Sequence, residues 1–367
     1  MARELGARTI ATTAPRWPKR VLILREGSDY GGDFGLSFAE GFRDHGCEVE
    51  LAGRSESWHQ EYDLVLGYGP FTLSASMLPV AHRLLALPVE RRPVFVWWLT
   101  EGTPQPWLPT WFVEVAAGLR LALDRRLVRS SAVDAMPARP SGAAFSSRGH
   151  RLRVFGELRW LQSRGILGVL AVTSASRATY LRRRGFQPIT VPLGYHPVYG
   201  TDLGLPRDID VCFLGSTDSK RRGLLLERVQ RELRRYGTEV SVQTALYGDS
   251  RTRFLNRARI IVNILRVSHD SVGQRFLLAA ANKTLAISEP IKDSEPFRPG
   301  HHLVVTPIER LAETVQFYLS HEEERRQIVE EAYRLVTQEL TITRAIGRII
   351  EHAREVYASR LCASHVR

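Results

Sequence analysis

The sequence is poor in cysteine and lysine, and it has no long apolar run. Its three cysteines, Cys47, Cys212 and Cys362, are far apart, which argues against a disulfide framework or a zinc cluster and favours a reducing cytosol. No apolar stretch approaches the ~18 residues that a membrane-spanning helix requires. Residues 1–18 are basic but lack the apolar core of a signal peptide, so we expect a loose tail there.

Arginine supplies nearly all the positive charge. Lys and Arg number 51 against 39 Asp and Glu, a net charge of +12, and only four of the basic residues are lysine. Such a charge suggests an anionic partner: nucleic acid, an acidic lipid surface or a phosphorylated small molecule. Nucleic-acid-binding tails usually carry basic runs of about five to eight residues, whereas the longest runs here are residues 182–184 and 220–222. The absence of longer basic runs therefore argues against nucleic acid as the partner.

Short apolar runs alternate with amphipathic segments along the chain. Residues 20–24, 62–67 and 93–99 are continuous apolar runs, which are typical of parallel strands covered by helices on both faces. The pattern starts afresh at residues 209–214, after a connector rich in turn residues at 193–206. A chain of 367 residues is also long enough for two domains of about 150 residues each.

We therefore expect two successive α/β domains. Residues 19–197 would form the N-terminal domain, 198–345 the C-terminal domain, and 346–367 a final helix that can cross back to the N-terminal domain. Two capping boxes, Thr306-Pro-Ile-Glu309 and Ser320-His-Glu-Glu323, predict the starts of helices in the second domain.

Residues that follow the predicted strands are the candidates for a site, because doubly wound α/β domains bind ligands at the carboxyl ends of their strands. In the C-terminal domain one such strand-to-helix loop contains Gly215, Ser216, Arg221 and Arg222. Small residues let the backbone approach a ligand, and the arginines stand where they could meet a phosphate. The alternative is a solvated helix start that touches no ligand.

A second candidate region opens the next predicted helix of this domain. Asp270 or Ser271 can cap that helix, which would leave its amide-rich N-terminus facing the cleft beside Arg275. A helix dipole and a guanidinium together suit a diphosphate. Glu289 ends another buried strand, where it could accept hydrogen bonds from a ribose or sugar diol; a salt bridge to Arg275 or Arg298 is the alternative.

Several segments of the second half carry a recognisable pattern. They are Val191-Pro-Leu-Gly-Tyr-His-Pro197, Arg207-Asp-Ile-Asp-Val-Cys-Phe-Leu-Gly-Ser216, Leu255-Asn-Arg-Ala-Arg-Ile-Ile-Val-Asn263, Arg275-Phe-Leu-Leu-Ala-Ala-Ala-Asn282, Ile287-Ser-Glu-Pro290 and Pro296-Phe-Arg-Pro-Gly-His-His-Leu-Val-Val305. Together they resemble group-1 glycosyltransferases of the GT-B fold, and most of all the bacterial spore-maturation-type branch. The resemblance covers residues 150–355 and reaches the N-terminal third only in architecture. It implies a GT-B fold, in which two Rossmann-like domains face a central cleft.

The resemblance also implies that the C-terminal domain binds a nucleotide-diphosphate sugar. Its donor-binding residues would be Gly215, Ser216, Arg221, Arg222, Arg266, Gly273 and Arg275. The family holds the donor sugar and ribose with two glutamates eight positions apart, but the matching positions here are His269 and Leu277. Glu289 or Glu295 could replace the ribose contact. Retention and inversion of the anomeric configuration both stay open.

In the N-terminal domain, the resemblance places a turn with Gly31, Gly32 and Asp33 across the cleft from the donor. This turn would help admit the acceptor, or it is a plain turn. Glu101 follows a tryptophan-rich strand and is the candidate general base, since a carboxylate near an acceptor hydroxyl can take its proton. A helix cap or an ion pair is the alternative role of Glu101. His196, in the connector, is the second catalytic candidate, or else it shapes the hinge.

We therefore expect a cytoplasmic glycosyltransferase with a nucleotide-sugar as co-substrate and with neither a metal nor another cofactor. Arginines and helix dipoles can stabilise a leaving diphosphate in place of a cation. The acceptor could be a small molecule, a glycan or a lipid-linked compound, with peripheral contact to a membrane. Three alternatives stay open: a catalytically silent GT-B relative, a nucleic-acid-binding protein, and a different GT-B reaction such as sugar epimerisation.

Overall fold

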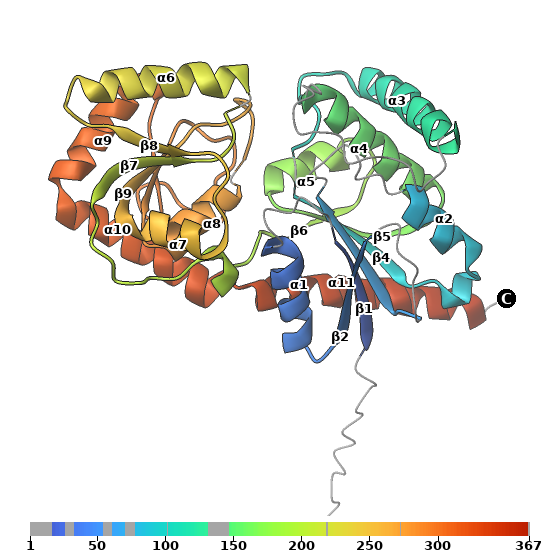
Figure 1. Cartoon of the computed structure of the whole chain (residues 1–367). Coiled ribbons are helices and arrows are strands. Elements are labelled where there is room, and N and C mark those ends of the chain that lie inside the picture. The colour runs from blue at the N-terminus through green and yellow to red at the C-terminus, as the bar shows by residue number, and fades with distance from the viewer. Residues whose placement is uncertain are drawn as a thin grey trace, which may run out of the picture.

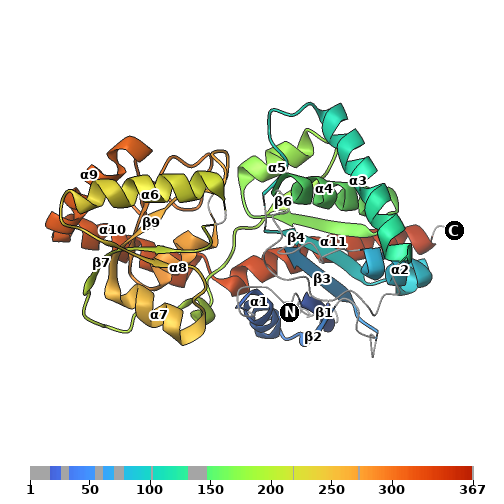
Figure 2. The same ribbon diagram turned by 45° about the horizontal axis from the view of Figure 1, so that its top comes forward.

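The computed structural model of the chain describes residues 17–25, 33–53, 61–69, 78–100, 102–130, 147–217, 219–271 and 273–365. These residues form two α/β domains, each built on its own parallel sheet (Figure 1, Figure 2). No helix in these ranges is long and apolar enough to cross a membrane.

The N-terminal sheet has six parallel strands in the order β2-β1-β3-β4-β5-β6. The strands are β1 (Arg20–Arg25), β2 (Glu48–Gly53), β3 (Leu64–Gly69), β4 (Val94–Leu99), β5 (Leu167–Val172) and β6 (Pro188–Thr190). β3 and β4 are buried at every position, as their continuous apolar runs predict. Along β4, Phe95 and Trp97 belong to one core layer, and Val96 and Trp98 belong to the other.

Helices cover both faces of this sheet. One face packs against α2 (Leu78–Ala86), α3 (Thr110–Ser130), α4 (Ser147–Ser163) and α5 (Ala175–Arg182). The other face packs against α1 (Asp33–Asp44) and α11 (Ile342–His365), the last helix of the chain (Figure 1). The ring of Tyr357 on α11 stacks on Trp17, with centroids 4.7 Å apart. The C-terminal helix is thus part of the N-terminal core.

The C-terminal sheet has five parallel strands in the order β11-β10-β9-β7-β8. The strands are β7 (Ile209–Leu214), β8 (Val240–Gln243), β9 (Ala258–Asn263), β10 (Leu285–Ser288) and β11 (Val304–Val305). The helices are α6 (Lys220–Arg234), α7 (Gly248–Arg257), α8 (Gln274–Ala281), α9 (Leu311–Ser320) and α10 (Glu322–Arg334). One face of the sheet packs against α7 and α8, and the other packs against α6 and α9.

Two segments cross between the domains side by side: the connector after β6 and the chain that enters α11. The N–H of Tyr195 donates to the carbonyl of Leu340 at 2.6 Å, and the N–H of Ile342 donates to the carbonyl of Tyr195 at 2.8 Å. A Cβ on Gly194 would come within 2.5 Å of the Ile342 backbone, so only glycine lets the two segments approach this closely.

A buried ion pair adds a further link between the domains. Asp33, at the start of α1, pairs with Arg251 of α7, and both side chains are almost fully buried. Arg251 also donates to the carbonyl of Val198 at 2.7 Å, and Ser37 shares a 2.9 Å hydrogen bond with Tyr199. Removing one of the two charges would break a buried ion pair, which is strongly destabilising. The pair therefore fixes α1 against the C-terminal domain.

Both predicted capping boxes are wrong, although helices do follow them. The backbone N–H of Thr306 donates to the carbonyl of Ser288, so Thr306 extends the sheet edge, and its hydroxyl accepts a 3.1 Å hydrogen bond from Thr314. Ser320 is the last residue of α9, and its hydroxyl donates to the carbonyl of Gln316 at 3.0 Å. Neither side chain caps the helix after it.

Candidate active site

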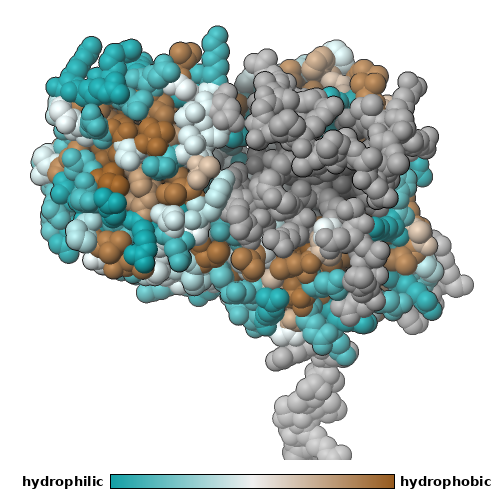
Figure 3. Space-filling model, viewed as in Figure 1, coloured by the Kyte–Doolittle hydropathy of each residue, from teal (hydrophilic) through white to brown (hydrophobic). Residues whose placement is uncertain are grey.

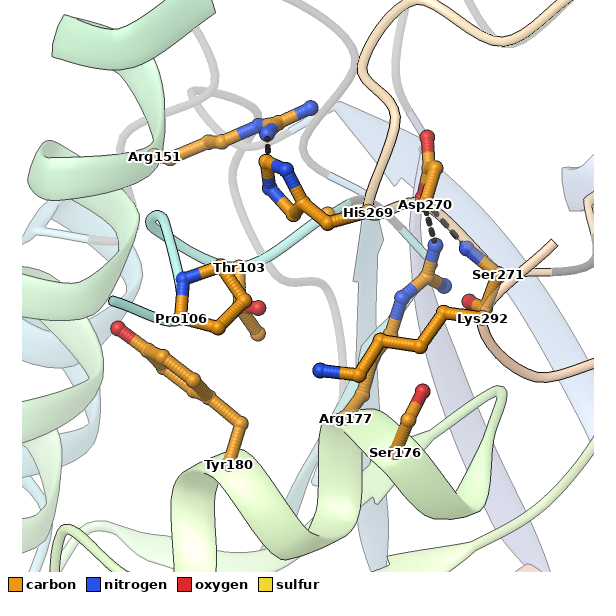
Figure 4. A pocket seen from close by; sticks show the side chains of 11 residues that line it. Thr103, Pro106, Arg151, Ser176, Arg177, Tyr180, His269, Asp270, Ser271 and Lys292 are labelled. Atoms are coloured by element: carbon orange, nitrogen blue, oxygen red, sulfur yellow. Dashed lines mark hydrogen bonds and ion pairs between the residues drawn. The ribbon is translucent and has the colours of Figure 1, made fainter. Parts of the chain in front are cut away.

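A pocket of about 340 Å³ opens between the domains (Figure 4). The N-terminal domain contributes the loop after β4 together with α4 and α5, and the C-terminal domain contributes the loops after β9 and β10. The lining residues are Gly102, Thr103, Pro106, Arg151, Ser176, Arg177, Tyr180, His269, Asp270, Ser271 and Lys292. The pocket thus lies at the carboxyl ends of strands from both sheets, where doubly wound domains bind ligands.

Arg177 holds the two sides of the pocket together. Its guanidinium is buried, and it forms a 3.1 Å ion pair with Asp270 of the opposite domain. It also donates to the Thr100 carbonyl at 3.2 Å and to the Thr173 hydroxyl. These bonds fix the guanidinium at the pocket wall, in the position drawn in Figure 4.

Two hydrogen bonds between loops reinforce this ion pair. The Ser174 hydroxyl donates to the Ser271 hydroxyl at 3.2 Å, and the N–H of Ser176 donates to the Asp293 carboxylate at 2.7 Å. Ser174 also caps α5 by accepting from the N–H of Arg177. The start of α5 is therefore tied directly to the loops of the C-terminal domain.

His269 presents an unused hydrogen-bond donor at this pocket. Burial, with a smaller contribution from the Arg151 charge, lowers the pKa of His269, so its ring is neutral at pH 7. Nε2 faces the guanidinium of Arg151 at 3.5 Å and can only accept there, which leaves the proton on Nδ1. Nδ1 is buried, and no described residue offers it a partner. It is thus available to donate to a ligand oxygen.

The hydroxyl of Tyr180 is a second unused polar group at the pocket. It is buried, and none of the residues that the structure describes forms a hydrogen bond with it. Burial raises the pKa of Tyr180 to about 12, and the Arg184 guanidinium lies 3.8 Å from the centre of its ring. The phenol therefore stays protonated at neutral pH and can donate.

A second, more apolar pocket of about 270 Å³ has Leu277 in its wall. It is lined by Thr173, Pro192, Leu193, Gly273, Leu277, Pro296, Phe297 and Leu340. Leu277 is buried in α8 and occupies one of the two positions where the related glycosyltransferases are expected to hold a glutamate. No carboxylate is among the residues that line this pocket.

Gly215 and Arg275 are in direct contact at the end of β7. Gly215 has a φ of +134°, and a Cβ there would lie 2.7 Å from Nη2 of Arg275. Arg275 donates to the Leu214 carbonyl at 2.9 Å and to the Asn263 side chain, and its guanidinium lies 5.2 Å from the centre of the Phe213 ring. Glycine at 215 therefore makes the room that the guanidinium occupies.

Glu289 forms an ion pair with Arg221 and with neither of the arginines that the sequence suggested. Arg221 donates to both carboxylate oxygens, at 2.8 and 2.5 Å, and this bond raises the pKa of Arg221. Glu289 also accepts from the N–H of Leu265 at 2.7 Å and is almost fully buried. These contacts hold the loops after β7, β9 and β10 together, while the contact of Glu289 and Arg221 with a donor stays a prediction.

Arg222 is bonded to backbone carbonyls of its own domain, and its contact with a donor stays a prediction. Its guanidinium is buried and donates to the Ile264 carbonyl at 2.8 Å and to the Ser216 carbonyl at 3.0 Å. These two hydrogen bonds connect Arg222 to the chain after β9 and to the loop after β7, and the second one holds the Ser216 carbonyl in place.

The N-terminus of α8 begins at Gly273, and the expected cap by Asp270 or Ser271 is wrong. Gly273 is the N-cap and supplies no side chain, while Asp270 bonds to Arg177 and to the N–H of Ser271. The first turn of α8 holds no acidic residue, so the positive end of its dipole is not offset by a carboxylate within the helix. Two further donor candidates, Arg266 and Glu295, lie exposed on loops of the same domain.

The N-terminal and connector candidates are less closely tied to the pocket. Glu101, Gly31 and Gly32 lie outside the described residues. Asp33 is engaged in the interdomain ion pair with Arg251. His196 lines neither pocket: its ring bonds to Glu40 of α1 at 2.5 Å, and its Nδ1 accepts from the N–H of Val198 at 3.1 Å. These bonds hold the connector, and the catalytic role of His196 stays a prediction.

Arg151, Arg177, Tyr180 and Lys292 are among the pocket residues that sequence reasoning missed. One local signal could have found Arg177, since Thr-Ser-Ala-Ser-Arg directly follows the buried end of β5. Lys292 is one of only four lysines in the chain. Nothing in the local sequence of α4 indicates that Arg151 faces a pocket.

The architecture of the two domains defines the fold of the protein. Two Rossmann-like domains that face a central cleft are the GT-B fold, so the fold expected from the sequence is confirmed. Residues 214–351 match a family model described as glycosyl transferase-like. The match covers the C-terminal domain and the start of the last helix.

Particular solved structures share this fold over almost the whole chain. HepE from Anabaena, in complex with UDP and glucose, superposes with a TM-score of 0.57 at 13% identity, covering 92% of this chain and 100% of its own. Sucrose-phosphate synthase from Thermosynechococcus elongatus gives a TM-score of 0.56 at 12% identity, covering 93% and 100%. A glycosyltransferase from Rickettsia africae gives 0.51 at 11% identity, covering 92% and 98%. No curated protein matches the sequence.

Proposed function

We propose that the protein transfers a sugar from a nucleotide-diphosphate donor to an acceptor hydroxyl in the pocket between its domains, without a metal ion. The observation that carries the proposal is the pocket itself, which both domains line at the carboxyl ends of their strands. HepE, which has this fold, binds UDP-glucose, so a UDP-sugar is the first donor to test. We also propose that its function is most similar to that of the bacterial spore-maturation-type glycosyltransferases.

The donor diphosphate would lie between Arg275 and the start of α8. Arg275 is held beside Gly215 by two hydrogen bonds, and the adjacent helix offers backbone amides in a first turn that contains no acidic residue. A guanidinium and a helix dipole both favour the charge that develops on a leaving diphosphate. They could therefore replace a metal ion.

The sugar and the acceptor would meet in the pocket beside Arg177 and His269. The acceptor oxygen would form a bond to the anomeric carbon, the bond from that carbon to the diphosphate would break, and the nucleoside diphosphate would leave. The acceptor proton would pass to a general base, for which Glu101 is our candidate from the sequence. Nδ1 of His269 and the hydroxyl of Tyr180 are the free donors that could position sugar or acceptor oxygens.

Thermal unfolding in the presence of UDP-, GDP-, dTDP- and ADP-sugars tests donor binding. One of these nucleotides at millimolar concentration should raise the melting temperature of the wild type. Arg275→Ala should remove that rise, whereas Arg257→Ala, which alters an exposed ion pair on α7, should retain it. If none of the four shifts the melting temperature, the proposed function is wrong. Release of sugar or nucleoside diphosphate from the donor that binds then measures turnover.

A catalytically silent relative is the second candidate, and one observation favours it. Leu277 is buried in an apolar pocket where the resemblance leads us to expect a carboxylate. A silent protein would gain stability from a nucleotide but would neither hydrolyse nor transfer the sugar of any of the four donors. Turnover that Arg275→Ala abolishes would exclude this alternative.

The acceptor and the cellular site are also proposals. Arg151, Arg177 and Lys292 make the pocket rich in cations, which suits a phosphorylated or otherwise acidic acceptor, whether it is a small molecule, a glycan or a lipid-linked compound. We place the reaction in the cytoplasm, because three scattered cysteines suit a reducing compartment.

A further inference from the structure

Helix α3 has an apolar face that nothing in the described structure covers. Trp111, Val115, Leu119 and Leu123 follow one another at intervals of four residues and are each between 55% and 68% exposed. Residues four apart lie on the same side of a helix, so these side chains form one stripe, which we call the α3 stripe.

The α3 stripe is not the face that holds the helix to its domain. Val113 and Ala117 belong to the core layer between the sheet and α4, and Leu121 on the same side of the helix is also buried. A helix of a water-soluble domain usually carries polar residues opposite its core face. The second apolar face therefore needs a partner outside the described domain, because exposed apolar stripes of this kind mark interaction sites.

The α3 stripe leads to the pocket. Figure 1 shows that α3 begins on the side of its domain that faces the C-terminal domain and runs away along the outer edge. Trp107, four residues before Trp111, is 69% exposed, and its ring lies 5.1 Å from that of His269, which lines the pocket. Figure 3 shows apolar side chains in brown along the upper edge of this domain, where Figure 1 places α3.

Charge favours a lipid surface over a second copy of the chain. The protein carries a net charge of +12, so two copies repel each other, whereas a bilayer with anionic headgroups attracts it. Two tryptophans at one end of the stripe suit the boundary between headgroups and acyl chains, where their amphipathic rings are enriched.

We propose that the α3 stripe docks the protein on an anionic membrane surface. The helix would lie in the plane of the interface with its outer face among the acyl chains, and Trp107 would bring the mouth of the pocket to the lipid headgroups. Resting on the proposed function, this geometry makes the acceptor a lipid-linked compound whose polar head enters the pocket from the membrane.

Sedimentation with lipid vesicles tests the docking surface without any nucleotide. The vesicles are phosphatidylcholine alone or phosphatidylcholine with roughly one third phosphatidylglycerol. The double variant Val115→Glu with Leu119→Glu changes the stripe, and the matched control is Leu224→Glu with Phe317→Glu. The control pair is also exposed, lies on α6 and α9, and changes the net charge equally.

We expect the wild type and the control to bind the anionic vesicles alike. The α3 variant should bind at least about tenfold more weakly, because two apolar side chains are replaced by charges that the acyl region excludes. Brominated lipid should quench the tryptophan fluorescence of the wild type, and Trp111→Phe, which keeps an apolar ring, should reduce that quenching.

Three results would overturn the proposal. The first is that the wild type does not bind anionic vesicles. The second is that the α3 variant binds them as well as the control does. The third is that the wild type is a dimer in solution and the α3 variant is a monomer. Nucleotide-induced thermal shifts are measured in parallel and show whether the α3 variant is folded. If the wild type binds vesicles but no nucleotide raises the melting temperature of the wild type or of either variant, the proposed function is contradicted and the docking surface is still supported.

Discussion

Replacing Gly215 by alanine tests whether Arg275 belongs to a donor site. Gly215 has a φ of +134°, where a side chain is strained by about 1–3 kcal/mol. The new Cβ would also lie 2.7 Å from Nη2 of Arg275, so the guanidinium must move. If Arg275 binds the diphosphate, its displacement loses a charge-assisted hydrogen bond of about 1.5–3 kcal/mol. UDP should then bind roughly ten- to a hundredfold more weakly.

Gly237→Ala is the matched control for this variant. Gly237 also has a positive φ, of +75°, but no atom lies within 4 Å of the place its Cβ would take. Urea unfolding and calorimetric titration with UDP separate the two effects. Both variants should lose stability, and only Gly215→Ala should lose affinity for UDP. Equal affinities would refute the placement of Arg275 at the diphosphate.

Two further predictions concern the link between the domains and the pocket histidine. Arg251→Met breaks the buried ion pair with Asp33, so the free energy of unfolding in urea should fall by about 3–5 kcal/mol. Arg257→Met, at the surface, should change it little. An unchanged value for Arg251→Met would show that the pair is not a stabilising link. Burial lowers the pKa of His269 below its ordinary 6.5, so the unfolded chain takes up the proton first as the pH falls. The stabilising contribution of the neutral His269 ring should therefore be fully present above about pH 6.5 and decline below it. The melting temperature should fall less at acidic pH in His269→Gln than in the wild type. Parallel pH profiles of the two melting temperatures would contradict this.

Strand positions could be predicted because burial on both faces leaves a continuous apolar run in the local sequence. β3 and β4 show this directly, since each is buried at every position. α3 gives no such signal. Val113 and Ala117 face the core while Val115 and Leu119 are exposed, so its apolar residues follow no single helical face. No helix is therefore predicted there from the sequence.

The pocket could be predicted only where its residues follow a strand. The loop that holds His269 and Asp270 was singled out in this way, whereas Arg151 lies on α4 and reaches the pocket only through the packing of one domain against the other. The contacts of Arg222 could not be predicted from the local sequence either. It stands in sequence where a phosphate ligand is expected, but its guanidinium is bonded to the Ile264 carbonyl within the domain. Local sequence does not determine which way such a side chain turns.

Binding of a nucleotide-diphosphate sugar between the two domains is tested most directly by a crystal structure of the protein with UDP-glucose. We predict that the diphosphate contacts Arg275 and the first amides of α8, and that the glucose reaches the pocket beside Arg177 and His269. UDP-glucose bound anywhere else on the protein, or an empty cleft at a concentration that saturates binding in solution, would contradict this prediction.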